Sequence, residues 1–211
     1  SSYHSTNNND IIFGSVGGTT SSRGFFRNVG DTRRVGTEFG LSGILKEKID
    51  WYLNYSFVEA TFEDGFIGVS ANHPNAVDLN GDGTANEIQV EAGDRIPGIP
   101  EHSIKIGGTY NFNDRFSIGV SGIYNSDQVL RGDESNQLQT VDGYFITNAN
   151  ATYEINKNFS FFAKINNLFD TDYETFGLLG EADEIFGSFV DSRFLGAGAP
   201  IAIFVGIKIT F

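Results

Sequence analysis

The last eleven residues of the chain alternate strictly between large apolar side chains and a mixed set. Every second position from 201 to 211 carries isoleucine, valine or phenylalanine: Ile201, Ile203, Val205, Ile207, Ile209 and Phe211. The positions between them include Gly206, Lys208 and Thr210. Successive side chains of a strand point to opposite faces, so this period predicts a β-strand with one apolar and one mixed face.

The same period recurs along the chain and predicts an all-β fold of about eight antiparallel strands. The segments that alternate are 33–45, 49–61, 103–112, 116–125, 143–154 and 158–168, together with a polar first segment, 1–14. Short connections at 46–48, 113–115 and 155–157 take turns with long ones at 62–102, 126–142 and 169–199. Short turns at one end and long loops at the other are typical of outer-membrane β-barrels.

Composition limits how such a chain can meet a membrane. The 211 residues are 39% hydrophobic and contain no cysteine, which excludes disulfides, thiolate zinc sites and cysteine nucleophiles. No apolar stretch approaches the ~20 residues that a spanning helix needs, so a membrane role requires strands. No basic and then apolar leader is visible, so an exported protein would be a processed form or a fragment.

Charge is distributed unevenly between the two kinds of connection. The three long connections hold 19 acidic and three basic residues, whereas the whole chain has a net charge of −13. Such an acidic chain is not expected to bind nucleic acid. The acidic side is explained either by solvated carboxylates or by loops that hold divalent cations or attract a cationic ligand.

Aromatic residues gather beside the short turns and at the terminus, as in the interfacial girdle of a membrane barrel. They are Trp51, Phe112, Phe116, Tyr153, Phe159 and Phe211. Ordinary strand propensity and core packing explain the same placement.

Three segments together resemble signatures of the C-terminal barrel of TonB-dependent outer-membrane receptors. They are NVGDTRRVGTE at 28–38, GDRIPGIPEHS at 93–103 and NNLFDTDY at 166–173. The resemblance implies an antiparallel transmembrane β-barrel in the bacterial outer membrane. Residues 1–211 would be the C-terminal portion of a larger barrel of about 22 strands.

The resemblance also implies a function, which is TonB-dependent uptake of a scarce nutrient, most often a ferric siderophore. In this family a plug domain and a short box engage a TonB-type energy-transducing protein, and neither is expected within 1–211. The implied partners are the plug and N-terminal strands of the same receptor, outer-membrane lipid and a small-molecule ligand.

One local motif predicts a metal site. Asp78, Asn80 and Asp82 place oxygen side chains at the first, third and fifth positions of a calcium loop, with Gly83 at the sixth. The glutamate expected at the twelfth position is replaced by Gln89, so Glu87 or Glu91 would have to substitute. The alternative is a turn rich in Asp, Asn and Gly at a loop tip.

Other chemistry is sparse. No nucleophile elbow and no Ser/His/Asp order in a strand-to-helix context is present, so we expect no enzyme. Arginines that would meet an anionic or ferric-chelate ligand are Arg33, Arg34, Arg131 and Arg193, although barrel arginines more often pair with carboxylates. The histidines, His4, His73 and His102, have no partner that the sequence reveals.

Two rival folds make different structural demands. A self-contained eight-stranded outer-membrane protein with an adhesive or structural role requires residues 1–14 to pair with 200–211. A soluble calcium-binding β-sandwich requires Ile201, Val205 and Ile209 to lie in a dry protein core. An outer-membrane enzyme would require convergent Ser, His and Asp side chains.

Overall fold

The computed structural model describes residues 1–15, 24–181 and 191–210, and in these ranges it contains strands and no helix that could span a membrane. Eight strands form one antiparallel sheet in the order β1-β4-β5-β8-β9-β10-β11-β14. Their bounds are β1 Ser2–Asn7, β4 Thr32–Leu45, β5 Ile49–Phe62, β8 His102–Asn113, β9 Phe116–Asn125, β10 Tyr144–Asn156, β11 Phe159–Asn166 and β14 Ala202–Ile209. The predicted all-β antiparallel fold is therefore confirmed.

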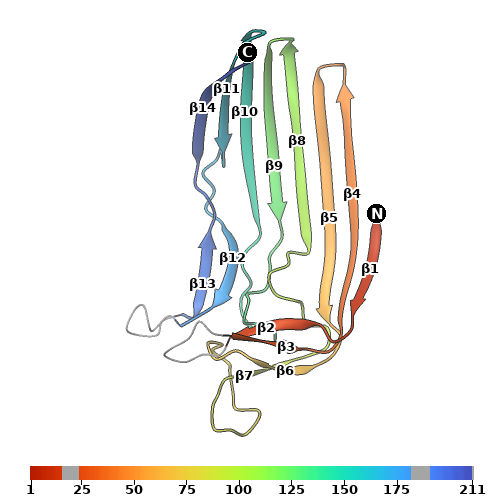
Figure 1. The fold of residues 1–211 in the computed structure, drawn as a ribbon, viewed down its shortest axis with the longest axis vertical. Coiled ribbons are helices and arrows are strands. Elements are labelled where there is room, and N and C mark those ends of the chain that lie inside the picture. Colours follow the sequence, from red (N-terminus) through yellow and green to blue (C-terminus); the bar gives the residue numbers. More distant parts are fainter. Residues whose placement is uncertain (16–23, 182–190, 211) are drawn as a thin grey trace.

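Three short hairpins lie beyond one end of this sheet, opposite the short turns (Figure 1). They pair β2 Ile11–Ser15 with β3 Gly24–Asn28, β6 Phe66–Val69 with β7 Glu87–Val90, and β12 Glu174–Leu179 with β13 Arg193–Ala197. The last two hairpins fall in connections that the sequence presented only as long loops. Short strands with few alternating residues carry too weak a periodic signal to be recognised.

The sheet is open, because its two outer strands do not meet. Among the described residues β1 pairs only with β4, and β14 pairs only with β11. The self-contained eight-stranded barrel required β1 and β14 to pair with each other. That rival is not supported.

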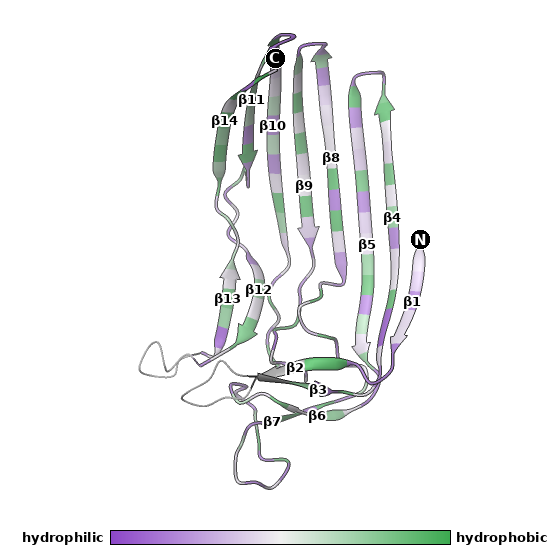
Figure 2. Ribbon diagram, in the orientation of Figure 1, coloured by the Kyte–Doolittle hydropathy of each residue, from purple (hydrophilic) through white to green (hydrophobic). Residues whose placement is uncertain are grey.

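The register gives the sheet one apolar face, as the alternation predicted. Residues directly opposite one another on neighbouring strands share a face, so Ile165, Ile203, Ala163 and Val205 lie together. Figure 2 shows apolar and polar residues alternating along most of the long strands. Ile203 and Val205 are each 66% exposed, so this face has no protein packed against it.

These exposures also decide against the soluble sandwich. Ile201, Val205 and Ile209 were required to lie in a dry core, and they are 41%, 66% and 49% exposed. Phe211 lies outside the described residues, so its place at the end of the row stays a prediction.

The packed apolar core lies instead at the hairpin end. Val29, Phe62, Ile88 and Val90 are each at most 2% exposed and form one cluster, with Ile12, Phe66 and Ile96 packed around it. Phe62 and Phe66 meet edge to face at 5.1 Å. The cluster joins the end of β5 to two of the three hairpins.

Aromatic rings form a row at the short-turn end of β8, β9 and β10. Tyr110 contacts Phe112 at 4.5 Å, Phe112 contacts Phe116 at 5.0 Å, and Phe116 contacts Tyr153 at 6.4 Å between ring centroids. For these three strands the expected clustering of rings at this end is confirmed.

The prediction of one strand over residues 1–14 is wrong. β1 ends at Asn7, and Asn9 then takes a positive φ of 51°, a conformation that asparagine tolerates better than most residues. The backbones of Asp10 and Gly30 and of Asp10 and Val29 then hydrogen-bond, and β2 leaves the sheet to pair with β3. The polar alternation continued through the turn and concealed it.

Candidate functional site: the loop layer

The irregular segments and hairpins beyond the long-loop end of the sheet form what we call the loop layer (Figure 1). It comprises residues 8–15, 24–31, 63–101, 126–143, 167–181 and 191–201. Most of the acidic residues of the chain lie in it. In it, polar side chains from different long connections meet.

Arg95 ties two of the long connections together. Its guanidinium lies 3.3 Å from a carboxylate oxygen of Glu101 and 3.0 Å from one of Asp127. Its backbone N–H donates to Asn136 Oδ1, and Asn136 Nδ2 donates back to its carbonyl. Arg95 belongs to the GDRIPGIPEHS signature, so this signature residue has a structural role.

The NNLFDTDY signature likewise closes the end of β11. Asn167 has a φ of 49° and is 2% exposed. Its Nδ2 donates to the carbonyls of Thr171 and Ala199, and its Oδ1 accepts the N–H of Thr171. One side chain thereby joins the two ends of the connection that leads to β14.

A buried histidine and aspartate join the same two long connections as Arg95. His73 Nε2 lies 3.0 Å from Asp133 Oδ1, and the two side chains are 0% and 1% exposed. The N–H of Asn75 donates to His73 Nδ1, so Nε2 carries the proton and donates to the carboxylate. The Ser135 hydroxyl and the N–H groups of Gln137 and Leu138 also donate to Asp133.

The sequence did not reveal this pair, because His73 and Asp133 are 60 residues apart. His73 is followed by Pro74 and has no acidic neighbour in the chain that would mark it. Only the packing of one long connection on the other brings the two together.

The surroundings of His73 and Asp133 contain further carboxylates, Glu134 and Asp94, whose pKa values are raised. Burial raises the pKa of the partly buried Glu134, and the negative charge of Asp133 adds to that rise. Burial also raises the pKa of Asp94, with Glu91 and Asp133 contributing like charge. At neutral pH these carboxylates therefore oppose the packing of the loop layer.

We expect Glu134→Gln to make the loop layer more resistant to protease at neutral pH, because it removes a buried charge and keeps an oxygen to accept the N–H of Gly132. A raised pKa means that the packed state binds the proton more readily. Its stability therefore rises as pH falls from neutral towards the ordinary carboxyl pKa near ~4.3, and the advantage of the variant should shrink over that range. Proteolysis rates of variant and wild type, compared at each pH, measure this; a difference independent of pH would contradict it.

The predicted calcium loop folds as a compact turn. Asp78 accepts the N–H groups of Gly81, Asp82 and Gly83, and Asn80 Oδ1 accepts the N–H of Asp82. Hydrogen bonds from the Thr84 N–H and the Asn80 side chain hold the pKa of Asp82 below its usual range.

Of the two proposed substitutes for the missing glutamate, Glu87 turns towards this loop. Its carboxylate accepts from Asn80 Nδ2 and from the N–H of Leu79. Glu91 lies against Asp94 instead, and its backbone N–H donates to the Asp94 carboxylate. No cluster of three or more His, Cys, Asp or Glu side chains in the described ranges is arranged to hold a metal ion, and calcium binding by Asp78, Asn80 and Asp82 stays a prediction.

If calcium binds there, adding it should slow proteolytic cleavage within residues 78–84. Asp82→Asn, which removes a charge from the loop, should weaken that protection, whereas Asp142→Asn in another connection should not. Cleavage that is unchanged across a calcium titration would show that the motif is only a turn.

The four candidate arginines separate into two kinds. Arg33 contacts Glu59 and Glu63, Arg34 contacts Asp10, and Arg193 contacts Asp191, at 2.7 to 3.4 Å. Arg131 is exposed, and its guanidinium has no carboxylate partner among the described residues. The other histidines have simpler settings, since His102 meets the Tyr55 hydroxyl and His4 lies opposite Val35 on β4.

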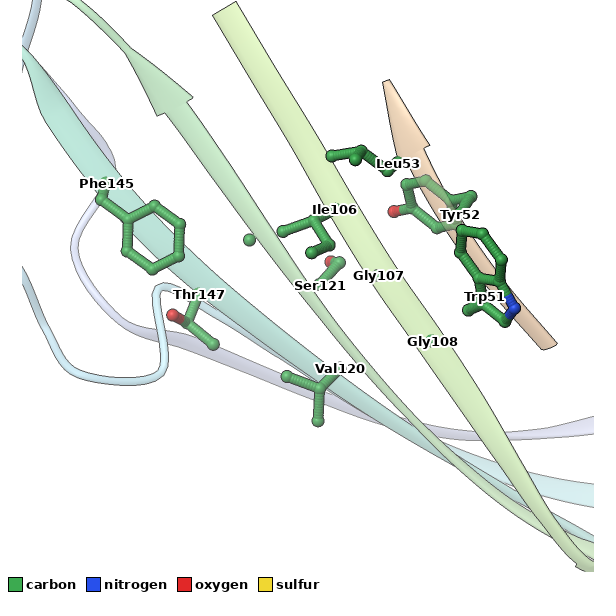
Figure 3. Close-up of a pocket in the computed structure, with 11 residues that line it drawn as sticks. Trp51, Tyr52, Leu53, Ile106, Gly107, Gly108, Val120, Ser121, Phe145 and Thr147 are labelled. Atoms are coloured by element: carbon green, nitrogen blue, oxygen red, sulfur yellow. The ribbon is translucent and has the colours of Figure 1, made fainter. Parts of the chain in front are cut away.

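A groove of about 520 Å³ crosses β5, β8, β9 and β10 on the sheet itself (Figure 3). Its walls include Trp51, Ile106, Val120 and Phe145, and the register places these side chains on the apolar face. The Phe145 ring lies over Gly122, 2.6 Å from where a Cβ would stand. Because its lining is almost entirely apolar, the groove offers no charged group to orient a polar ligand.

The sequence matches the profile of a known family over most of its length. The TonB dependent receptor-like β-barrel family matches residues 1–168. The "Probable TonB-dependent siderophore receptor PiuA" of Acinetobacter baumannii is 27% identical over 150 residues, which cover 71% of this chain and 18% of that protein. The "Catecholate siderophore receptor Fiu" of Escherichia coli K12 is 27% identical over 110 residues, covering 52% and 13%.

Solved structures agree on the fold. PiuA of A. baumannii superposes with a TM-score of 0.63 at 19% identity, over 87% of this chain and 22% of that one. Fiu of E. coli K12 superposes with a TM-score of 0.62 at 20% identity, over 99% of this chain and 24% of that one. The copper transporter OprC superposes with a TM-score of 0.68 at 19% identity, over 100% of this chain and 28% of that one.

The chain thus spans less than a fifth of the length of these two sequence relatives. Its strand order, its exposed apolar face and the family match over residues 1–168 agree with one another. The chain belongs to the TonB-dependent receptor family and corresponds to the C-terminal portion of the receptor β-barrel.

Proposed function

We propose that this chain forms the C-terminal wall and long loops of an outer-membrane receptor that takes up a scarce nutrient, namely a ferric siderophore. The observation that supports the membrane location is the exposed apolar face of the eight-stranded sheet. The names of PiuA and Fiu support the ligand class. The family is one of transport receptors rather than enzymes.

The apolar face fits a hydrocarbon environment. The long strands β4, β5, β8, β9 and β10 have 10 to 14 residues each, enough for the ~9–11 that a tilted transmembrane strand needs. The opposite face carries Lys105, Lys164 and Asn150, which suits a polar lumen. In this proposal, further strands of the same receptor pair with the outer edges of β1 and β14.

The rest of the mechanism follows the family. The loop layer would capture the ligand on the outer side, and a TonB-type protein would act on a plug domain to open a path through the barrel. This chain would supply wall and loops, and the plug would bear the force. A copper complex is a second candidate ligand, since OprC shares the fold at a TM-score of 0.68.

The membrane part of the proposal predicts that Val205→Lys lowers the yield of folded receptor in outer membranes. A lysine on the lipid face near the bilayer centre costs about 2–4 kcal/mol. Ala202→Lys is the matched control, because Ala202 belongs to the same strand, lies on the opposite face and faces the neutral Asn166. Folded yield is read from protease resistance in isolated outer membranes. Equal yields of the two variants would argue against lipid contact by the odd-numbered residues of β14.

The transport part predicts energy-dependent uptake by the complete receptor that contains this chain. Cells that lack their own siderophore receptors should take up radioactive iron as ferric enterobactin or ferric citrate only when the complete receptor is expressed. Uptake should stop when the TonB-type protein is deleted or the proton gradient is collapsed. Uptake of copper but not of any ferric chelate would replace the siderophore with the second candidate.

A further inference from the structure

The long connections contain three basic residues, Arg95, Arg131 and Arg193, and Arg131 differs from the other two. Arg95 is neutralised by Glu101 and Asp127, and Arg193 by Asp191. The side chain of Arg131 is exposed and makes no ion pair within residues 1–15, 24–181 and 191–210. A charged group is normally solvated or paired, so an unpaired guanidinium held by the fold is available to a ligand.

The backbone holds Arg131 where the three long connections meet. Its N–H donates to the carbonyl of Gly177 at 3.0 Å, and its own carbonyl accepts the N–H of Leu179 at 2.9 Å. On its N-terminal side Leu130 is 1% exposed. The backbone of Arg131 is therefore held in place, although its side chain is exposed.

The long connection 62–102 makes room for the Arg131 guanidinium at Gly98. Gly98 lies beside it, and a Cβ on that glycine would stand 3.2 Å from Arg131 Nε, in a position whose φ of 75° already favours glycine. The N–H of Gly98 donates to the carbonyl of Val129 at 2.9 Å, which fixes the two segments against each other.

The acids next to Arg131 in the chain are directed elsewhere. Asp133 is 0% exposed and accepts from His73, Ser135 and two backbone N–H groups. Glu134 accepts the N–H of Gly132 at 3.1 Å. The loop layer is acidic as a whole, but the carboxylates nearest to Arg131 in the sequence accept hydrogen bonds from other groups of the protein and not from the Arg131 guanidinium.

We propose that Arg131 binds the anionic oxygens of the transported ferric chelate, either catecholate or carboxylate. The planar guanidinium presents several N–H donors in a fork that matches such oxygens. This inference rests on the proposed function, because it requires that the complete receptor carries a ferric chelate. Arg131 then favours an anionic chelate over an uncharged one.

The test measures binding to the complete receptor in detergent, with ferric enterobactin as a catecholate, ferric citrate as a carboxylate and an uncharged ferric hydroxamate. Arg131→Ala should weaken binding of the anionic probe about tenfold, the loss expected for one charge-assisted contact. Arg131→Lys should recover part of this loss, since it restores the charge without the fork. Hydroxamate binding should change in neither variant, and Arg193→Ala, which alters an already paired arginine, should leave all affinities within about twofold.

The outcomes distinguish the inference from the function on which it rests. If Arg131→Ala weakens binding of only one anionic probe, that result identifies the oxygens that Arg131 contacts as catecholate or carboxylate. If Arg131→Ala binds every probe as the wild type does, or if the wild type binds only the hydroxamate, the inference fails and ferric uptake stands. If the wild type binds none of the three, both fail. Protease fragments of Arg131→Ala should match the wild type; if they differ, Arg131→Lys decides instead, and unchanged anionic affinity there overturns the role of the fork.

Discussion

Backbone hydrogen bonds between neighbouring strands hold the long sheet together, because among the described residues no packed core lies behind either of its faces. The fully buried apolar side chains are all in the loop layer or beside it, as Phe62, Ile88 and Leu130 illustrate. A single-layer sheet of this kind has little hydrophobic stabilisation of its own in water. In an apolar medium each amide–carbonyl bond is worth about 4–6 kcal/mol, against a net of about 0.5–1.5 in water. The same ladder is therefore a weak structure in one solvent and a strong one in the other, which is why the proposed lipid contact of the apolar face matters to the whole fold.

The loop layer is stabilised in the opposite way. Its cluster around Phe62 and Val90 is an ordinary water-excluding core. Arg95, His73 and Asp133 then add polar contacts between connections that are far apart in sequence. Backbone hydrogen bonds between connections, such as those of Arg131 with Gly177 and Leu179, add to this, so the backbone of the loop layer is held at defined points although many of its side chains are exposed.

The sequence predicted the sheet well and the loop layer poorly, for one physical reason. Strand alternation is local, so the segment 116–125 was recognised with the bounds that the structure gives β9, and 49–61 ends one residue short of β5. Contacts such as His73 with Asp133 depend on how two connections pack, and nothing near either residue encodes them. The calcium motif was visible because its oxygens lie within five residues, yet local spacing did not reveal that Glu87 would turn towards it. The candidate arginines were visible as residue types, but which of them stays unpaired depended on the fold.

The acidity of the loop layer has a structural explanation that composition alone did not suggest. Irregular backbone leaves N–H groups without strand partners, and these groups take side-chain oxygens or water as acceptors. Carboxylates serve this purpose repeatedly: Asp78 accepts three backbone N–H groups, Asp133 two, and Asp64 and Asp170 one each. A carboxylate occupied in this way remains negative but presents less free acceptor capacity to a ligand. The net charge of the long connections therefore overstates the number of free carboxylate acceptors that a ligand would meet, and an acidic loop layer is compatible with an anionic ligand bound through one exposed arginine.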